Sequence, residues 1–103
     1  MERREVVFSP EALGDLLSLY DYIAADSGPA RAIAYIGRIE GYCARFDLAA
    51  QRGTRRDDIR PGLRLVGFER RVTIAFHVGP TKVTIDRILY GGRQVEDAFA
   101  RER

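Results

Sequence analysis

Residues 61–93 read PGLRLVGFERRVTIAFHVGPTKVTIDRILYGGR, and this stretch has the pattern of three β-strands joined by two turns. β-Branched and aromatic residues alternate with polar ones over Pro61–Val66, Arg71–Val78 and Lys82–Tyr90, as expected of strands with one buried face. The pair Gly79–Pro80 supplies the backbone angles of a tight turn between the last two strands. The spacing therefore predicts a three-stranded antiparallel meander.

The segment before the meander predicts a short strand followed by two helices. Val6–Phe8 is an apolar run of strand length. Ser9–Glu11 has the residue types of a helix start: a capping hydroxyl, a proline at the first position, and an acid near the positive end of the dipole. This helix is expected to end near Gly28, and Pro29 suits the first position of a second helix. Two helices joined so closely predict an antiparallel hairpin.

Each predicted helix carries an apolar stripe at helical spacing, which we assign to the core. The stripes are Leu13, Leu16, Leu17, Tyr20, Ile23 and Ala24 in the first helix, and Ala32, Ile36, Ile39, Cys43 and Phe46 in the second. Cys43 has no second cysteine to pair with, so we expect a small core residue. After the meander, Val95–Phe99 predicts one helical turn or a docked tail anchored by Phe99.

The order of strand, two helices and three strands favours an α+β fold, with the hairpin packed on one face of a mainly antiparallel sheet. A chain of 103 residues can form one modest core, so we expect a single domain over residues 1–103. No apolar run approaches the roughly 20 residues of a membrane span. The charged N-terminus lacks the pattern of a signal peptide, and we expect a cytoplasmic protein with no membrane partner.

Arginine dominates the basic residues of this chain. The net charge is only +2, yet sixteen of the seventeen basic residues are arginine, and residues 52–71 contain seven arginines against three acidic residues. Arginine binds carboxylates and phosphates bidentately and stays charged when partly buried. The bias is therefore consistent with an interaction surface; a solvated loop or a GC-rich genome produces the same bias.

The residues themselves point to no catalytic or metal centre. His77 is the only histidine, alternates with Phe76, and is expected to be structural or exposed; one histidine and one cysteine form no familiar metal cluster. We expect no metal and no cofactor. A basic and aromatic set remains on or beside the sheet, consisting of Arg64, Arg70, Arg71, Arg87, Arg93 and Tyr90. Such a set suits either the phosphates of a nucleic acid or the acidic groups of a protein partner, so direct nucleic-acid binding stays open.

The chain resembles the toxin subunits of the RelE/ParE superfamily, and it is more similar to ParE than to RelE. The resemblance covers about residues 6–93. It rests on Phe8–Ala12, Asp15–Leu16, Tyr22–Ile23, Pro29–Ala32, Gly53, Asp58–Arg64 and Val83–Arg93. It implies the strand–helix–helix–strands fold, and a toxin of a type II toxin–antitoxin system held inactive in a hetero-oligomer with a ParD-like antitoxin.

The resemblance offers two activities. ParE-like toxins are associated with inhibition of DNA gyrase, without enzymatic activity, whereas RelE-like toxins cut mRNA on the ribosome. Arg64 and Arg87 fall at family-like arginine positions and, with Tyr90, would be the catalytic residues of such an RNase. The accompanying lysines of RelE are missing, since the only lysine is Lys82 in a turn, and Tyr90 stands where many ParE-like chains have histidine. These departures from RelE favour inhibition of gyrase as the activity of this chain. The alternatives are an mRNA endonuclease, or a degenerate family member that binds its antitoxin but is not toxic.

Two sets of contact residues follow from this resemblance. The arginines of the sheet are the expected target-binding residues: Arg64, Arg70, Arg71, Arg87 and Arg93. The resemblance implies an antitoxin whose C-terminal segment folds on binding, lies along the helical hairpin and often adds contacts at the sheet. We therefore expect the antitoxin on the apolar hairpin surface left free by the core, which includes Leu19, Tyr22 and Tyr35.

Overall fold

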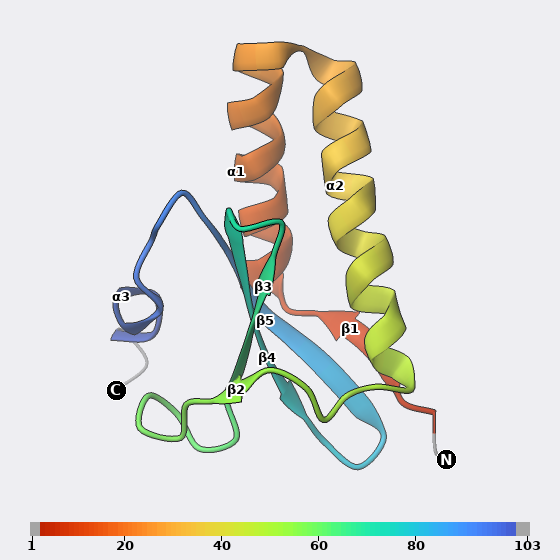
Figure 1. The fold of residues 1–103 in the computed structure, drawn as a ribbon, viewed down its shortest axis with the longest axis vertical. Coiled ribbons are helices and arrows are strands. Elements are labelled where there is room, and N and C mark those ends of the chain that lie inside the picture. Colours follow the sequence, from red (N-terminus) through yellow and green to blue (C-terminus); the bar gives the residue numbers. More distant parts are fainter. Residues whose placement is uncertain (1–2, 101–103) are drawn as a thin grey trace.

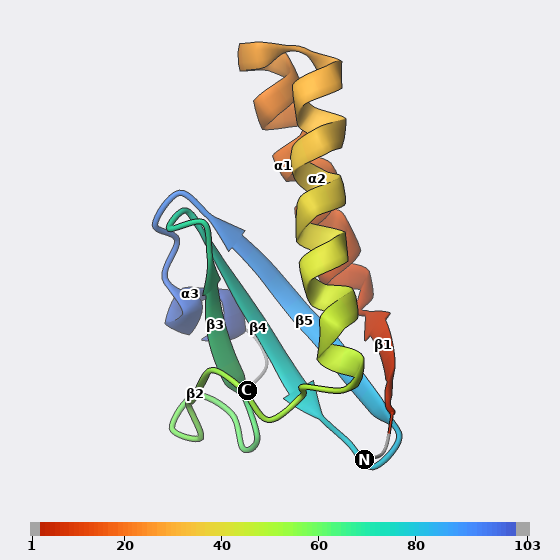
Figure 2. The ribbon, with the colours of Figure 1, turned by 45° about the vertical axis from the view of Figure 1, so that its right-hand side comes forward.

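The computed structural model describes residues 3–100 and consists of a five-stranded sheet, a long helical hairpin and a short C-terminal helix (Figure 1). The elements in chain order are β1 (Glu5–Phe8), α1 (Pro10–Ser27), α2 (Pro29–Ala44), the 3-10 turn η1 (Arg45–Asp47), β2 (Thr54–Arg55), β3 (Arg64–Phe68), β4 (Val72–Val78), β5 (Lys82–Tyr90) and α3 (Val95–Phe99). The hairpin covers one face of the sheet and extends beyond it, and α3 lies on the opposite face (Figure 2). The predicted α+β architecture is confirmed.

The sheet has the strand order β1-β5-β4-β3-β2. Strands β3, β4 and β5 form the antiparallel meander that the sequence predicts. Strand β1 pairs in parallel with β5, from Glu5 opposite Lys82 to Phe8 opposite Ile85. Because β1 has only four residues, it covers only the first part of β5 and leaves the rest of that edge to other groups.

Two details of the predicted meander are wrong. The first strand, predicted over Pro61–Val66, begins at Arg64 and extends to Phe68, because the chain before Leu63 forms a turn. The Leu63 N–H donates to the Arg60 carbonyl at 3.0 Å, and a glycine within this turn has a positive φ. In addition, β2, which no strand pattern in the sequence predicts, pairs with β3 and adds a strand next to the meander. A two-residue strand is too short to show an alternation in the sequence.

The boundaries of the helical hairpin agree with the prediction. The Ser9 hydroxyl accepts from the Ala12 N–H at 3.0 Å, Pro10 is the first helical residue, and α1 ends before Gly28, whose φ is 94°. Pro29 begins α2 directly afterwards. Within residues 3–100, none of the helices combines the length and the apolar character that crossing a membrane demands.

Two apolar clusters lie on the two faces of the sheet. The larger cluster is enclosed between the sheet and the hairpin and includes Phe46, Phe76 and the fully buried Cys43. Burial raises the pKa of the Cys43 thiol to about 12, so this cysteine is an unreactive core residue, as the sequence predicts. The smaller cluster lies under α3, where Phe99 packs with residues of β4 and β5, which confirms Phe99 as the anchor of the tail.

Gly53 allows the chain before β2 to pass close to β3. A Cβ at this position would lie 2.3 Å from the Leu65 carbonyl oxygen, and φ is +76°. Gly53→Ala is therefore expected to lower the free energy of unfolding by about 3 kcal/mol in urea denaturation, since it combines a backbone clash with a left-handed conformation. Gly62→Ala is the matched control, because its φ is +83° but no described atom lies within 4 Å. This control should lose about 1 kcal/mol; equal losses would contradict the steric argument.

Candidate functional site

Several arginines of the chain are paired with its own carboxylates. The ion pairs include Arg38–Glu69, Arg55–Asp57, Arg56–Asp58, Arg56–Glu96, Arg60–Asp86 and Arg87–Asp15. The hydrogen bond from Arg38 lowers the pKa of Glu69, and the one from Arg56 lowers the pKa of Asp58. Much of the arginine excess is thus neutralised within the fold, and the surface role of each predicted arginine depends on its own contacts.

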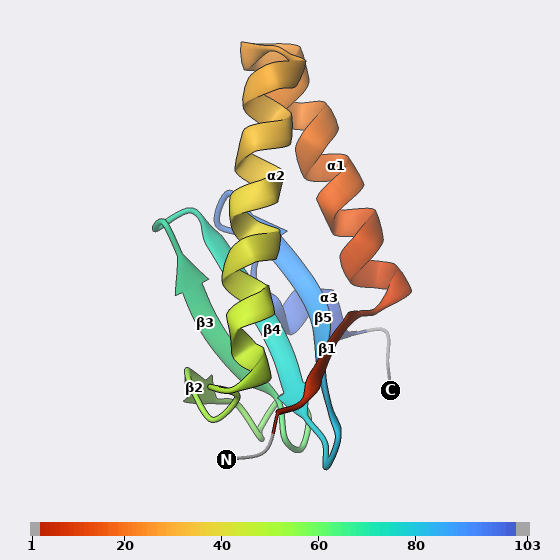
Figure 3. The same ribbon diagram turned by 90° about the vertical axis from the view of Figure 1, so that its right-hand side faces the viewer.

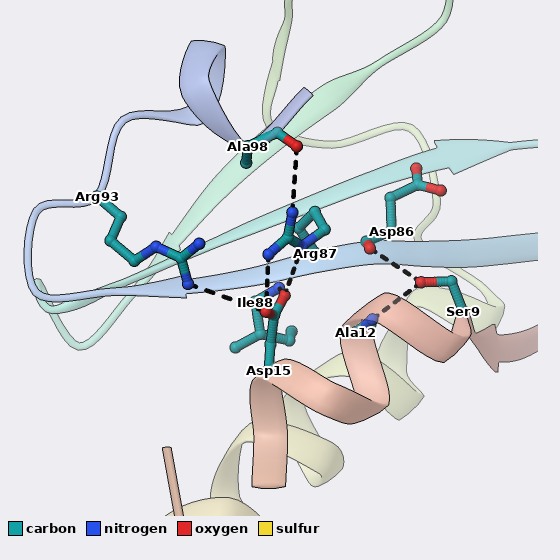
Figure 4. Close-up of polar contacts among 8 residues, drawn as sticks. All are labelled: Ser9, Ala12, Asp15, Asp86, Arg87, Ile88, Arg93 and Ala98. Atoms are coloured by element: carbon teal, nitrogen blue, oxygen red, sulfur yellow. Dashed lines mark hydrogen bonds and ion pairs between the residues drawn. The ribbon is translucent and has the colours of Figure 1, made fainter. Parts of the chain in front are cut away.

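Arg87 holds α1 and α3 to the sheet (Figure 4). Its guanidinium donates to both Asp15 oxygens, at 2.8 and 2.9 Å, and to the Ala98 carbonyl at 3.2 Å. The Asp15 carboxylate also accepts from the backbone N–H of Ile88 at 2.8 Å. The Asp15 and Arg87 side chains are only 8% and 17% exposed. A guanidinium held in this way has little capacity for a partner, so we leave Arg87 out of the interaction surface proposed below.

Asp15 and Ser9 also complete the edge of β5 beyond the end of β1. The Ser9 N–H donates to the Ile85 carbonyl, and the Ser9 hydroxyl donates to the Asp86 carbonyl, each at 2.9 Å. The Asp15 carboxylate then accepts a hydrogen bond from the N–H of Ile88. Two polar side chains at the start of α1 therefore replace the missing strand partner, which fixes the position of the hairpin relative to the sheet.

Arg64 and Arg93 do not lie together with Arg70 and Arg71. Arg64 donates to the Arg52 carbonyl at 3.2 Å and to the Gln51 side chain at 2.7 Å, and so holds the loop that follows η1. Arg93 is exposed and lies 3.9 Å from Asp15, beside the Arg87 ion pair. The predicted arginine surface is thus divided among three places on the molecule.

Arg70, Arg71 and Tyr90 do lie together. With Tyr22 from α1 and the Gly91–Gly92 backbone they line an open depression of about 310 Å³, here called the tyrosine hollow. The rings of Tyr22 and Tyr90 have centroids 5.5 Å apart at a 58° tilt. The Tyr90 hydroxyl accepts a hydrogen bond from Arg71, which raises the pKa of that guanidinium. The hollow lies where the turn between β3 and β4 and the end of β5 meet α1.

The turn beside the tyrosine hollow has an unusual backbone. Glu69 and Arg70 both have positive φ, 49° and 65°, although neither is glycine. This conformation costs about 1–2 kcal/mol per residue for L-amino acids. Both residues are the central positions of the tight turn that the Arg71 N–H closes by donating to the Phe68 carbonyl at 3.3 Å, and a hairpin turn of this type requires positive φ at both positions. The turn therefore presents Arg70 and Arg71 beside the hollow.

A second depression lies between the helices and is here called the outer groove. It has a volume of about 470 Å³ and is mostly apolar; its lining residues are Leu13, Leu16, Leu17, Tyr20, Ile33, Ile36 and Glu40. Leu13, Leu17 and Ile33 are 51%, 69% and 63% exposed. Three large apolar side chains thus face solvent along one groove, which is the usual character of a protein-binding surface.

The structure corrects the assignment of the helix faces. The sequence places Leu13 and Leu17 in the core, yet both are exposed; it places Leu19 on the free surface, yet Leu19 is only 4% exposed. Leu19 lies on the same face as Ala12 and Leu16, at spacings of three and four residues, and this face packs on the sheet. Periodicity identified the apolar positions but not which of two neighbouring stripes is buried.

The other two residues predicted to contact the antitoxin lie outside the outer groove. Tyr22 is 62% exposed and belongs to the tyrosine hollow. Tyr35 is partly buried against the larger cluster, where its ring contacts Phe68 edge-on and Arg38 lies over it. Burial raises the pKa of the Tyr35 hydroxyl, which has no hydrogen-bond partner among residues 3–100. No pattern in the sequence indicates Ile33 as a groove residue, although it lies one position after the predicted stripe residue Ala32.

His77 belongs to a polar cluster on the opposite face of the sheet from the hairpin. Its Nδ1 lies 2.8 Å from an Asp86 carboxylate oxygen, which also pairs with Arg60 at 3.0 Å. Asp86 is the extra residue of a bulge between β4 and β5, which interrupts the alternation of the strand there. The predicted structural or exposed role of His77 agrees with this arrangement.

The fold, with a helical hairpin on a meander and a parallel first strand, is also found in a solved structure. A solved structure of the chromosomal ParDE TA system from P. aeruginosa contains a similar chain, with a TM-score of 0.75 and 25% sequence identity over 85% of this chain and 96% of that one. The family model of the ParE toxin of the type II toxin-antitoxin system parDE matches residues 6–95. The chain belongs to this ParE toxin family. No curated protein sequence matches it.

Proposed function

We propose that this member of the ParE family inhibits DNA gyrase in the cytoplasm without being an enzyme, and that a ParD-like antitoxin neutralises it by binding the outer groove. Family membership supports the toxin activity. The observation that carries the antitoxin proposal is the groove itself, with Leu13, Leu17 and Ile33 exposed between α1 and α2. Figure 3 shows α1 and α2 side by side along their length.

The shape and chemistry of the groove suit an amphipathic helix. Apolar side chains from two antiparallel helices form its walls, so a third helix can insert residues at spacings of three and four. Glu40 lies at the groove and is exposed, which favours a basic residue at the matching position of the antitoxin. Such a segment would fold on binding and would bury the apolar side chains that α1 and α2 leave in water.

The geometry does not favour the RNase alternative. Arg64 and Arg87, the arginines that such an activity would use, both donate hydrogen bonds to groups of the fold itself. Positioning an mRNA phosphate would require breaking these contacts, and for Arg87 it would leave the buried Asp15 unpaired. We therefore do not propose this activity.

Purified toxin added to a gyrase supercoiling assay is expected to inhibit supercoiling, and stoichiometric antitoxin is expected to restore it. mRNA recovered from translating ribosomes after induction should stay intact, because the proposed toxin does not cut RNA. Supercoiling that proceeds unchanged at every toxin concentration would refute gyrase as the target. Transcripts cut on the ribosome would instead support the endonuclease.

A further inference from the structure

Two exposed arginines meet two aromatic rings in the tyrosine hollow. Arg70 and Arg71 are exposed and line the same depression as Tyr22 and Tyr90. Among residues 3–100, no carboxylate forms an ion pair with either arginine. The nearest acid in sequence, Glu69, is held by Arg38 through two hydrogen bonds of 2.9 and 3.0 Å. The positive charge of the hollow is therefore not neutralised by the fold.

We propose that the tyrosine hollow binds a carboxylate from an acidic segment of the toxin's protein target. Two guanidiniums supply planar sets of donors that match a carboxylate. The rings of Tyr22 and Tyr90 provide an apolar wall for the aliphatic part of an aspartate or glutamate side chain.

The distribution of charge favours a protein carboxylate over a nucleic acid. A nucleic-acid strand needs a row of cations that follows its phosphates. Here two of the cations beyond the hollow are held in close ion pairs, Arg38 with Glu69 and Arg87 with Asp15, and Arg93 lies 3.9 Å from Asp15. The hollow thus offers an isolated cationic site beside acidic residues, which suits one or two carboxylates and not a continuous polyanion.

The position of the hollow favours the target over the antitoxin. Tyr22 lies nine residues after Leu13 in α1, about 180° around the helix at roughly 100° per residue. The outer groove and the hollow therefore open on opposite sides of α1. An antitoxin helix seated in the groove would therefore lie on the side of α1 away from the hollow. The assignment of the segment to gyrase rests on the proposed function, whereas the carboxylate chemistry of the hollow does not.

The first test measures the chemistry without gyrase. A fluorescein-labelled hexaglutamate peptide is titrated with the wild type, Arg71→Gln and Arg45→Gln by fluorescence anisotropy, with hexaglutamine and a thymidine hexanucleotide as comparison probes. Arg45→Gln is the matched control, because Arg45 is exposed at the far end of α2 and the substitution removes the same charge. Hexaglutamate should bind in a salt-dependent manner, and Arg71→Gln should weaken it about tenfold while the control does not.

Three results of this test would overturn the proposal: equal binding of hexaglutamate and hexaglutamine, equal effects of the two substitutions, or stronger binding of the oligonucleotide at the same residues.

The second test uses gyrase and antitoxin. Arg71→Gln should raise the toxin concentration for half-inhibition about tenfold and leave the antitoxin affinity within about threefold of wild type. Loss of antitoxin affinity with full inhibition would reject the target assignment. A wild type that binds hexaglutamate through Arg71 but does not inhibit gyrase would refute only the proposed target.

Discussion

Leu17→Glu is expected to release this toxin from its antitoxin, with a loss of affinity of about 100-fold or more. Leu17 is 69% exposed in the outer groove, so the substitution should leave the fold intact. In the complex, however, the new carboxylate would be buried among apolar side chains without a partner, and Glu40 would add a like charge beside it. Titration calorimetry with purified antitoxin measures the affinity, and co-expression measures neutralisation in cells.

Leu48→Glu provides the matched control for this substitution. Leu48 is also an exposed leucine, at 45%, but it follows η1 and lies outside the groove. The control should bind the antitoxin with wild-type affinity and should remain neutralised on co-expression. Tight antitoxin binding by Leu17→Glu would place the antitoxin elsewhere on the toxin.

Asp15→Ala is expected to lower the free energy of unfolding by about 3–5 kcal/mol, a large part of the stability of a chain this size. The substitution leaves the Arg87 guanidinium mostly buried without its carboxylate, and it leaves the N–H of Ile88 at the sheet edge without an acceptor. Urea denaturation followed by circular dichroism measures the loss. The transition should shift to lower urea without a change of slope.

Two further variants show whether the loss comes from the ion pair. Asp21→Ala removes an exposed carboxylate from the same helix and should change stability by less than about 0.5 kcal/mol. Asp15→Asn keeps an acceptor for Ile88 but removes the charge, so its stability should fall between the wild type and Asp15→Ala. A loss for Asp15→Ala no greater than that for Asp21→Ala would show that Arg87 does not depend on its partner.

Local signals in the sequence predicted the parts of this fold that are determined locally. A capping serine with a following proline predicted the start of α1, and the glycine–proline pair at 28–29 predicted the break between the helices. Alternation predicted β4 and β5, whose buried residues are apolar except for Asp86. Strand β2 escaped prediction because two residues show no period, and its pairing depends on the close passage of Gly53.

The candidate sites were harder to predict because they depend on residues distant in the chain. Asp15 and Arg87 are 72 positions apart, and nothing in either segment indicates that they pair. Arg71 and Tyr90 both belong to the basic and aromatic set that the sequence predicts on or beside the sheet. Only the sheet register places them beside Tyr22. The outer groove depends on which apolar stripe of α1 faces the sheet. That choice is made by packing and not by periodicity.

The parallel pairing of β1 with β5 also determines the order in which the molecule can be completed during synthesis. The partners Glu5 and Lys82 are 77 positions apart in the sequence, so β1 cannot pair until β5 has been synthesised. The helical hairpin depends mainly on neighbours close in sequence and can form much earlier. On a nascent chain the outer groove therefore exists before the end of β5 brings Tyr90 to Tyr22. We expect the outer groove, proposed for the antitoxin, to form before the tyrosine hollow, proposed for the target.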